Sequence, residues 1–188
     1  MAKPGLELEG NQMRLCEFGE VHLLDDAYFG WLRDLEVIET INRIEYMMPI
    51  RFELVEAYVR RLWESPSDAF FAVIRRDDNR FIGTLRLAQI DWRVGSGDIG
   101  IMIGDRSCWN QGLAKDAVSV ACTYAFKRLG LRRLTAGTPE SNVAMRRCFE
   151  RLGFREEGRL RRHVILGGKT VDRVLFGLFA DEFTPYRL

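Results

Sequence analysis

The sequence predicts a single domain of the mixed α/β class, built on a mixed, mostly antiparallel sheet. In the first half, two apolar runs over residues 69–76 and 80–90 flank a polar Asp77-Asp78-Asn79 turn, which indicates an antiparallel hairpin. In the second half, strand patterns alternate with helix patterns, as in α/β connections. The 188 residues contain no linker rich in proline, glycine or serine, so we expect one core.

The first half also predicts one strand and two helices before the hairpin. We expect residues 1–10 to be loosely held and residues 13–18 to form a strand. Asp25 or Asp26 then caps a helix that places four apolar side chains on one face: Tyr28, Trp31, Leu32 and Leu35. A clearer amphipathic helix over residues 53–63 turns six side chains inward: Leu54, Val55, Tyr58, Val59, Leu62 and Trp63.

The second half predicts four strands, which cover residues 98–104, 132–138, 154–166 and 170–179. A Gly167-Gly168 turn joins the last two strands into a hairpin. The whole chain therefore predicts about seven strands and about four helices. We expect one domain over residues 11–183 and a short tail over residues 184–188.

Two helices lie between these later strands. The first begins at Gly112 and bears small apolar residues around most of its circumference, so we expect other elements to cover it largely. The second is capped by Ser141 or Asn142 and ends at Gly153, a glycine typical of the left-handed position after a helix.

The composition argues against several functional classes. Lys and Arg total 28 and Asp and Glu total 27, so the net charge is +1 and no general attraction to nucleic acid is expected. No apolar run reaches the roughly 18 residues of a membrane helix, and the N-terminus lacks the apolar segment of a signal peptide. We therefore expect no nucleic acid and no membrane among the partners.

Four cysteines lie far apart in the chain without a CxxC pair: Cys16, Cys108, Cys122 and Cys148. Only His22 and His163 are available as histidine ligands beside them, so we expect no metal site. Widely spaced thiols without a disulfide framework are typical of a reducing compartment. This pattern predicts a cytoplasmic protein whose thiols are buried.

Three short motifs are rejected on their context. GSGDIG, residues 95–100, has the letters of a dinucleotide-binding fingerprint, but a strand follows where the fingerprint requires a helix. GGKT, residues 167–170, lacks the first glycine of a P-loop and lies between two strands. RLRRH, residues 159–163, points its charges to both faces of a strand, so a solvated edge explains it better than a nucleic-acid site.

A strand, a short loop and a helix follow one another over residues 98–126, and Gly112 opens the helix. The first turn of a helix has unpaired N–H groups and a partial positive charge, which together bind anions. A phosphate can therefore approach four main-chain amides beside the Lys115 cation: Gln111, Gly112, Leu113 and Ala114. A tight turn that needs glycine explains Gly112 equally well, and the residues alone leave both interpretations open.

Two segments carry a more specific signal: DIGIMIGDRSCWNQGLAKDAV from Asp98 and TAGTPESNVAMRRCFERLGFREEGRLRRH from Thr135. Together they resemble the GNAT superfamily of acyl-CoA-dependent N-acetyltransferases, in the branch of the ribosomal-protein N-terminal acetyltransferases and their sugar- or antibiotic-modifying relatives. WLRDLEV and FGLFADEF are similar to the family's first helix and closing strand. The resemblance implies a GNAT fold and an N-acetyltransferase that uses acetyl-CoA.

Carried over residue by residue, the resemblance implies the contacts of acetyl-CoA. Main-chain groups of Ile101, Met102 and Ile103 would pair with the pantetheine arm in the manner of an added strand. The amides of residues 111–114 would hold the pyrophosphate, within a Q/R-x-x-G-x-G/A signature that falls on residues 109–114. Asn142 matches a position that contacts the pantetheine.

The chain departs from the family pattern at several positions. Trp109 replaces the Gln or Arg of the signature, and Asn110 replaces a glycine. Phe149 stands where many members have a tyrosine proposed as general acid, and phenylalanine cannot donate a proton. Met145 stands where the ribosomal branch often has serine. The source of a proton for the leaving thiolate is therefore open.

The implied reaction is direct attack of a neutral amine on the acetyl thioester. The amine needs a base, and the carbonyl oxygen needs a hydrogen-bond donor such as a main-chain N–H of residues 101–103. Asp98 matches a strand-start acid of relatives and is the candidate general base, although an ordinary strand carboxylate is the simpler interpretation. Packing, capping or solvation explains four further residues more simply than catalysis: Ser141, Cys148, His163 and Asp172.

We expect residues 35–51 and the last hairpin to build the acceptor site, where Arg43, Glu45 and Arg51 mix with apolar residues. The acceptor is open among a protein N-terminus, an amino sugar on a nucleotide carrier and another small amine. A non-catalytic acyl-CoA-binding module is the alternative function, motivated by Phe149 and by the lack of an obvious base. The resemblance also leaves a homodimer open.

Overall fold

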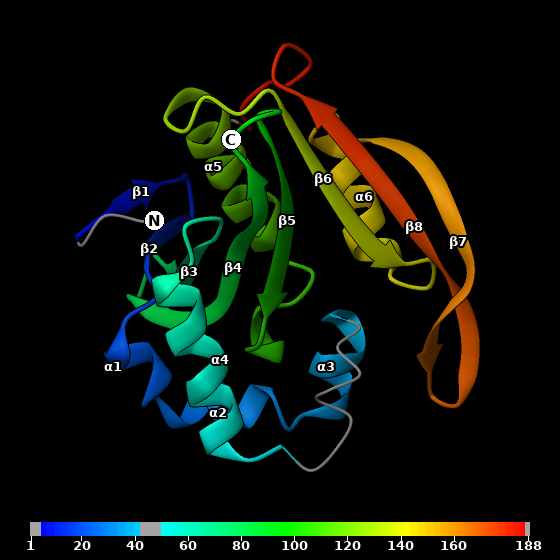
Figure 1. Cartoon of the computed structure of the whole chain (residues 1–188). Helices are drawn as coiled ribbons and strands as arrows, with labels where there is room; N and C mark the ends of the chain where they lie inside the picture. Colours follow the sequence, from blue (N-terminus) through cyan, green and yellow to red (C-terminus); the bar gives the residue numbers. More distant parts are fainter. Residues whose placement is uncertain (1–4, 42–49, 187–188) are drawn as a thin grey trace.

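The computed structural model describes residues 5–41 and 50–186, in which eight strands form one sheet in the order β1-β2-β3-β4-β5-β6-β8-β7 (Figure 1). The strands are β1 (Glu7–Glu9), β2 (Met13–Glu17), β3 (Ala69–Arg75), β4 (Arg80–Asp91), β5 (Ser96–Ile103), β6 (Arg133–Pro139), β7 (Arg155–Leu166) and β8 (Lys169–Phe179). The helices are α1 (Glu20–Leu23), α2 (Asp26–Trp31), α3 (Leu35–Ile41), α4 (Phe52–Glu64), α5 (Leu113–Lys127) and α6 (Val143–Arg151), with a 3-10 turn η2 (Arg106–Cys108) before α5. All strand pairs are antiparallel except β5 with β6.

This architecture confirms the predicted α/β class and the mostly antiparallel sheet. Within the described residues it holds one strand and two helices more than we expected, namely β1, α1 and α3. The expectation of a loose segment over residues 1–10 does not hold for β1, because Glu7, Leu8 and Glu9 pair with β2. A short edge strand of mostly exposed residues leaves little signal in the sequence.

The first predicted helix was expected to continue to Leu35, and this was wrong. α2 ends at Trp31, and Asp34 then accepts the amide of Glu36 at 3.0 Å, which begins the separate helix α3. Leu35 is therefore 66% exposed instead of facing inward with Tyr28. A side-chain cap at Asp34 offers the backbone a new helix start, which competes with continuation of α2.

Helices cover both faces of the sheet (Figure 1). α2, α3 and α4 pack on one face, here called the α4 face, whereas α5 and α6 pack on the other, the α5 face. The strand β3 serves both cores: Phe70 and Ala72 contact the α4 face, and Phe71 and Val73 contact the α5 face. Successive side chains of a strand point to opposite faces, so a strand that is buried along its length must lie between two layers.

Most other elements lie where the sequence predicts them. α5 is buried on most of its circumference, the GSGDIG motif lies in strand β5, and GGKT lies at the turn between β7 and β8. Asn142 caps α6 through its side chain, and Gly153 follows this helix with φ of 90°. In the described ranges, no helix combines the length and apolar character needed to cross a membrane.

Candidate active site

β5 and β6 part after a short parallel pairing, which creates an opening in the sheet. Residues 96–98 pair with residues 133–135, and beyond Asp98 the two strands are not paired with each other. The Gly104 amide donates to the Ile82 carbonyl at 2.8 Å, and an antiparallel ladder alternates bonded and non-bonded pairs. The main-chain groups of Ile101 and Ile103 therefore face the opening.

Met102 differs from its two neighbours. By the same alternation its amide and carbonyl face β4, and its side chain lies in the α4 core with 5% exposure. A pantetheine arm in the opening therefore meets main-chain groups of residues 101 and 103, and the expected pairing with Met102 is not what this geometry offers. The reason is that alternate residues of β5 form their main-chain hydrogen bonds with β4, and sequence spacing alone does not show which residues these are.

The β6 side of the opening is also unpaired. The Ala180 amide donates to the Arg132 carbonyl and the Glu140 amide to the Asp172 carbonyl, so the even-numbered residues of β6 face β8. The main-chain groups of Gly137 consequently face the opening. The hydroxyl of Thr138 is buried and has no hydrogen-bond partner among the described residues. Because an unpaired buried hydroxyl costs free energy, this atom fits a polar group of a bound ligand.

A cleft of about 890 Å³ extends over the opening and under α4. Its polar and aromatic lining includes residues of α4, β4, both sides of the opening, β8 and α6, namely Tyr58, Arg86, Asp98, Thr138, Phe149 and Arg173. Such a volume suits a small ligand held by a few placed polar groups.

Asp98 lies where β5 and β6 part. The Thr135 hydroxyl donates to Asp98 Oδ2 at 2.9 Å, so the neighbouring strand orients the carboxylate. Asp98 is two residues before Gly100 and four before Met102, so its side chain also points to the α4 face. The predicted base thus lines the cleft at the base of the opening.

Arg86 and its partners form a cluster at the cleft that the sequence did not lead us to expect. Arg86 donates to Asp68 Oδ1 through Nε at 2.9 Å and Nη2 at 2.6 Å, and through Nη1 to the Tyr58 hydroxyl at 2.9 Å. Burial acts to raise the pKa of Asp68, but hydrogen bonds from Ser65 and Arg86 outweigh it and lower that pKa overall. Because the Tyr58 oxygen accepts from a guanidinium, its own hydrogen stays available to a ligand. A charged residue in the middle of an apolar strand was the available signal.

The N-terminus of α5 supports both interpretations of Gly112. Its φ is 78°, so the backbone conformation alone favours glycine, and a Cβ built there would meet nothing within 4 Å. In the described chain, the amides of residues 111–114 have no acceptor. Lys115, expected beside a phosphate, holds its ammonium 3.5 Å from the ring centroid of Tyr186 in the C-terminal segment.

Trp109 fixes the loop between β5 and α5. Its indole Nε1 donates to the Ile103 carbonyl at 2.7 Å, so this predicted pantetheine partner already accepts one hydrogen bond. Arg106 lies over the Trp109 ring and pairs with Glu36 of α3 at 2.5 Å. Asn142 uses its side-chain oxygen to accept the Met145 amide at 3.1 Å, which leaves its NH₂ group for a ligand.

Comparison with known sequences decides the family. A sequence model described as "Acetyltransferase (GNAT) domain" matches residues 18–155, which include the parted strands and the start of α5. The chain belongs to the GNAT acetyltransferase family. At the level of the family, this confirms the predicted enzyme class, an acyltransferase, and its co-substrate, acetyl-CoA.

Relatives and solved structures agree with the GNAT assignment. "Uncharacterized N-acetyltransferase p20" of Bacillus licheniformis is 31% identical over 113 residues, which span 60% of this chain and 63%, less than two thirds, of p20. Ribosomal protein uS5-alanine N-acetyltransferase of Escherichia coli (strain K12) is 22% identical over 177 residues, 93% of this chain and 90% of the relative. The crystal structure of spermidine N-acetyltransferase from Vibrio cholerae in complex with CoA and spermine has a TM-score of 0.81 at 19% identity, covering 91% and 97% of the two chains. This last likeness concerns the fold.

The GNAT site of this chain lacks a proton donor on α6. Phe149 is 3% exposed, and its ring packs at centroid distances of 5.1 Å from Phe154 and 5.5 Å from Phe176. Burial raises the pKa of the adjacent Cys148 thiol to about 12, although Lys115 and Arg151 act to lower it. Several hydroxyl groups line the cleft, among them those of Tyr58 and Thr138.

Several other residues lie apart from the GNAT cleft, as their simpler interpretations predict. Asp172 accepts the Arg162 amide at 2.8 Å within a bulge of β7, and His163 is exposed there. Ser141 is exposed before α6. Arg43 and Glu45, which we expected near the acceptor, lie outside the described residues. No group of three potential metal ligands occurs within residues 5–41 and 50–186.

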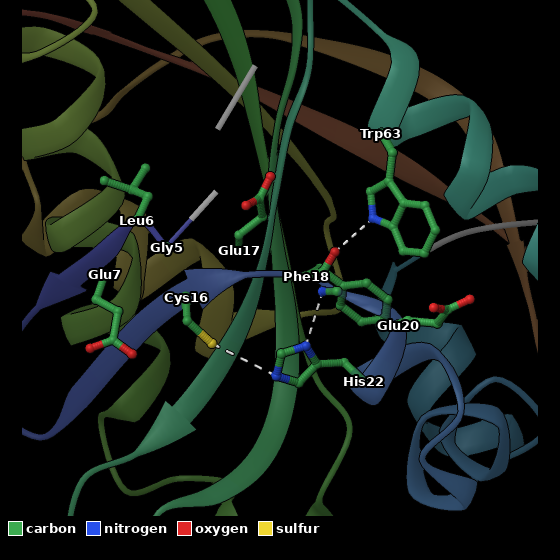
Figure 2. Close-up of a pocket in the computed structure, with 10 residues that line it drawn as sticks. Gly5, Leu6, Glu7, Cys16, Glu17, Phe18, Glu20, His22 and Trp63 are labelled. Atoms are coloured by element: carbon green, nitrogen blue, oxygen red, sulfur yellow. Dashed lines mark hydrogen bonds between the residues drawn. The ribbon is translucent and has the colours of Figure 1, made fainter. Parts of the chain in front are cut away.

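A second hollow, of about 480 Å³, lies beside β2, α1 and α4, and Figure 2 shows Cys16 and His22 side by side on its wall. The Gly19 amide donates to His22 Nδ1 at 3.1 Å, so Nδ1 is unprotonated and the Nε2–H group faces Cys16 Sγ at 3.7 Å. Burial raises the pKa of Cys16, so its thiol stays protonated near neutral pH. A histidine whose free nitrogen points away from the thiol cannot activate it, and we assign this hollow no chemistry.

Proposed function

We propose that this GNAT protein transfers the acetyl group of acetyl-CoA to a primary amine by direct attack within a ternary complex. One observation carries the proposal: the parting of β5 and β6 leaves main-chain groups of Ile101 and Gly137 facing each other's strand across an opening. Hydrogen-bonding groups without partners in the described chain flank it, namely the Thr138 hydroxyl and the first amides of α5.

These groups suit the parts of acetyl-CoA. Amides of residues 111–114 would hold the pyrophosphate, since unpaired N–H groups at a helix start bind anions. Main-chain groups of Ile101 and Ile103 would pair with the pantetheine amides as an added strand does. Asn142 and Thr138 would offer further hydrogen bonds from the β6 side. Lys115 would join the pyrophosphate only by leaving the Tyr186 ring.

The chemical step forms a C–N bond and breaks the C–S bond of the thioester. The amine nitrogen attacks the carbonyl carbon, its proton passes to Asp98 directly or through water, and the thiolate of CoA leaves. The main-chain N–H of Ile101 faces the opening and would donate to the carbonyl oxygen as negative charge develops. Thr135 supports Asp98 in this role by orienting its carboxylate.

The acceptor is an amine of one of three kinds: a protein N-terminus, an amino sugar, including one on a nucleotide carrier, or another small amine. The relatives include an enzyme named for ribosomal protein alanine and one named for spermidine, so the family relationship alone does not choose. A cytoplasmic setting, from the cysteine pattern, and a homodimer both stay predictions.

A non-catalytic acyl-CoA-binding module is the second candidate, favoured by Phe149 in place of a proton donor on α6. Calorimetric titration with acetyl-CoA, followed by thiol release against a panel of primary amines, separates the two. Saturable binding with thiol release on one amine class supports the enzyme. Binding without release on every class supports the module, and failure to bind acetyl-CoA contradicts both.

A further inference from the structure

The Arg173 side chain lies in the cleft, packed against Gly137 of the neighbouring strand β6. It opposes Pro139 in the pairing of β8 with β6, and its side chain runs back across Gly137. A Cβ added at Gly137 would lie 2.7 Å from Nε and 2.8 Å from Nη2 of Arg173. The guanidinium therefore rests on the floor of the cleft, in space that any larger residue at position 137 would occupy.

The charge of Arg173 is not used within the described structure. The side chain is half-buried, yet it has no carboxylate, hydrogen-bond or aromatic partner among residues 5–41 and 50–186. Arg86, by contrast, is committed to Asp68 and Tyr58. Arg61, the other arginine of the lining, is exposed and lies over the Tyr58 ring at 5.6 Å. A half-buried guanidinium with unused donors is matched best by a carboxylate or phosphate, which it binds in a bidentate manner.

The backbone around Arg173 is held in place on both strands. The carbonyl of the preceding Asp172 accepts the Glu140 amide at 2.9 Å, and the Asp172 side chain accepts the Arg162 amide at 2.8 Å. These bonds fix the bulge of β7 beside Arg173, and bulges commonly re-aim side chains next to sites. The backbone from which the Arg173 side chain extends is thus held in place.

Arg173 and the candidate base share one face of the sheet. Thr135 contacts Asp98 on the α4 face. Gly137 lies two residues further along the same strand, so the side of Gly137 that Arg173 covers also faces α4. At about 3.3 Å per residue, Gly137 is roughly 7 Å from Thr135. That separation is spanned by a small amine whose nitrogen lies near Asp98 and whose anionic group lies on Arg173.

We propose that Arg173 binds a carboxylate or phosphate of the acceptor, so that the enzyme is selective for amines carrying a negative charge a few bonds from the nitrogen. This inference rests on the proposed acetyl transfer and names the acceptor class for it. Under this proposal, the anionic group of the acceptor sets the specificity of the cleft, and amines without such a group are poor acceptors.

The test compares primary amines in three classes with saturating acetyl-CoA. β-Alanine and short peptides with an acidic second residue carry a carboxylate, 2-aminoethyl phosphate carries a phosphate, and ethanolamine and spermidine carry no anionic group. We expect thiol release from the anionic classes with kcat/KM at least about tenfold above the neutral and cationic amines. The carboxylate and phosphate arms show which anion fits. Equal or faster turnover of ethanolamine or spermidine overturns the proposal.

Two variants address Arg173 itself. Arg173→Gln is expected to raise KM for the anionic acceptor about ten- to hundredfold, with unchanged affinity for acetyl-CoA by calorimetry. Gly137→Ala should also raise KM for the anionic acceptor, since the added methyl group displaces the guanidinium while the arginine remains. Lys169→Gln removes an exposed cation from the start of the same strand and serves as the matched control.

The outcomes separate this proposal from the proposed function. Loss of acetyl-CoA affinity in Arg173→Gln would place the cation in the cofactor site and overturn its role toward the acceptor. Unchanged KM in both variants would overturn it as well, while acetyl transfer itself stands. Binding of acetyl-CoA with no thiol release from any amine class would contradict the proposed function, and this inference with it.

Discussion

Asp116 of α5 binds the main chain of Gln12, 104 residues earlier in the sequence, because its Oδ2 accepts the Gln12 amide at 2.7 Å. The same carboxylate accepts the amides of Asn11 at 3.1 Å and Met13 at 2.9 Å, and its residue is 1% exposed. One buried charge therefore satisfies three main-chain donors at the start of β2. The first turn of α5 and the first strands of the sheet are joined through it.

Replacing Asp116 should destabilise the whole fold. Asp116→Asn keeps the size of the side chain but removes the charge and leaves at least one amide poorly satisfied, so we expect a loss of about 2–4 kcal/mol in the free energy of unfolding. Urea denaturation followed by circular dichroism measures it. Asp181→Asn, at an exposed position, is the control and should change stability by less than about 0.5 kcal/mol. A loss no larger than that of the control would show that the carboxylate contributes little.

Gly112 can be tested by a residue that tolerates its backbone conformation. Valine is unsuited to φ of 78°, because β-branched residues are strained there. Asparagine adopts the left-handed region more readily, and the space beside residue 112 is open. Gly112→Asn should therefore fold with a loss of about 1 kcal/mol or less, yet weaken acetyl-CoA binding by crowding the pyrophosphate. Equal calorimetric affinity in a folded variant would leave the glycine with a purely conformational role.

Asp98→Asn tests the proposed base. The amide is nearly isosteric and can still accept from Thr135, but it cannot take a proton at neutral pH. We expect kcat to fall about a hundredfold, with the largest loss at lower pH, where the amine is hardest to deprotonate. The pH–rate profile of thiol release measures this, and acetyl-CoA affinity should be unchanged. A profile that superimposes on the wild type would remove Asp98 from the mechanism.

The buried His22 predicts a pH-dependent stability. Burial lowers the pKa of His22 below its ordinary value of 6.5, with the charge of Asp25 opposing the shift. The unfolded chain therefore binds this proton at a higher pH than the folded protein does. The stabilising contribution is complete above about pH 6.5 and is lost as the pH falls through the lower folded pKa.

The measurement is urea denaturation at pH 7.5 and pH 5.5. The wild type should lose more stability between these values than His22→Gln, which has no proton to gain at this position. The difference between the two proteins cancels the titration of groups they share. Identical pH dependence in both would show that His22 does not carry the effect.

Prediction from the sequence succeeded for elements with a clear local periodicity or an initial cap. Apolar residues at helical spacing located α4, and small apolar residues after Gly112 located α5 with its covered circumference. A capping side chain located the start of α6 at Asn142. It failed for β1, whose pairing with β2 has no periodic pattern of its own, and for the break before Leu35, where the Asp34 cap competes with continuation of the helix.

Some residues of the candidate site were predicted from the sequence and others were not. The amides before α5 and the position of Asp98 in a strand follow from short-range pattern and from the family resemblance. Arg86 and Arg173 were missed, because what distinguishes them is the group that each contacts in the folded protein: Asp68 and Tyr58 for one, Gly137 for the other. The sequence shows that a strand contains an arginine, but it does not show which groups the guanidinium contacts after folding.

The sequence by itself determined the order of the longer helices and strands, the glycine start of α5 and the family, because periodicity, capping and signature spacing act within a few residues. Only the tertiary structure decided which groups meet. Three such features involve residues far apart in the chain. β5 separates from β6, the Arg173 side chain lies against Gly137, and the Asp116 carboxylate binds the Gln12 amide. Such contacts depend on strand order and ladder phase, which are set when the sheet assembles.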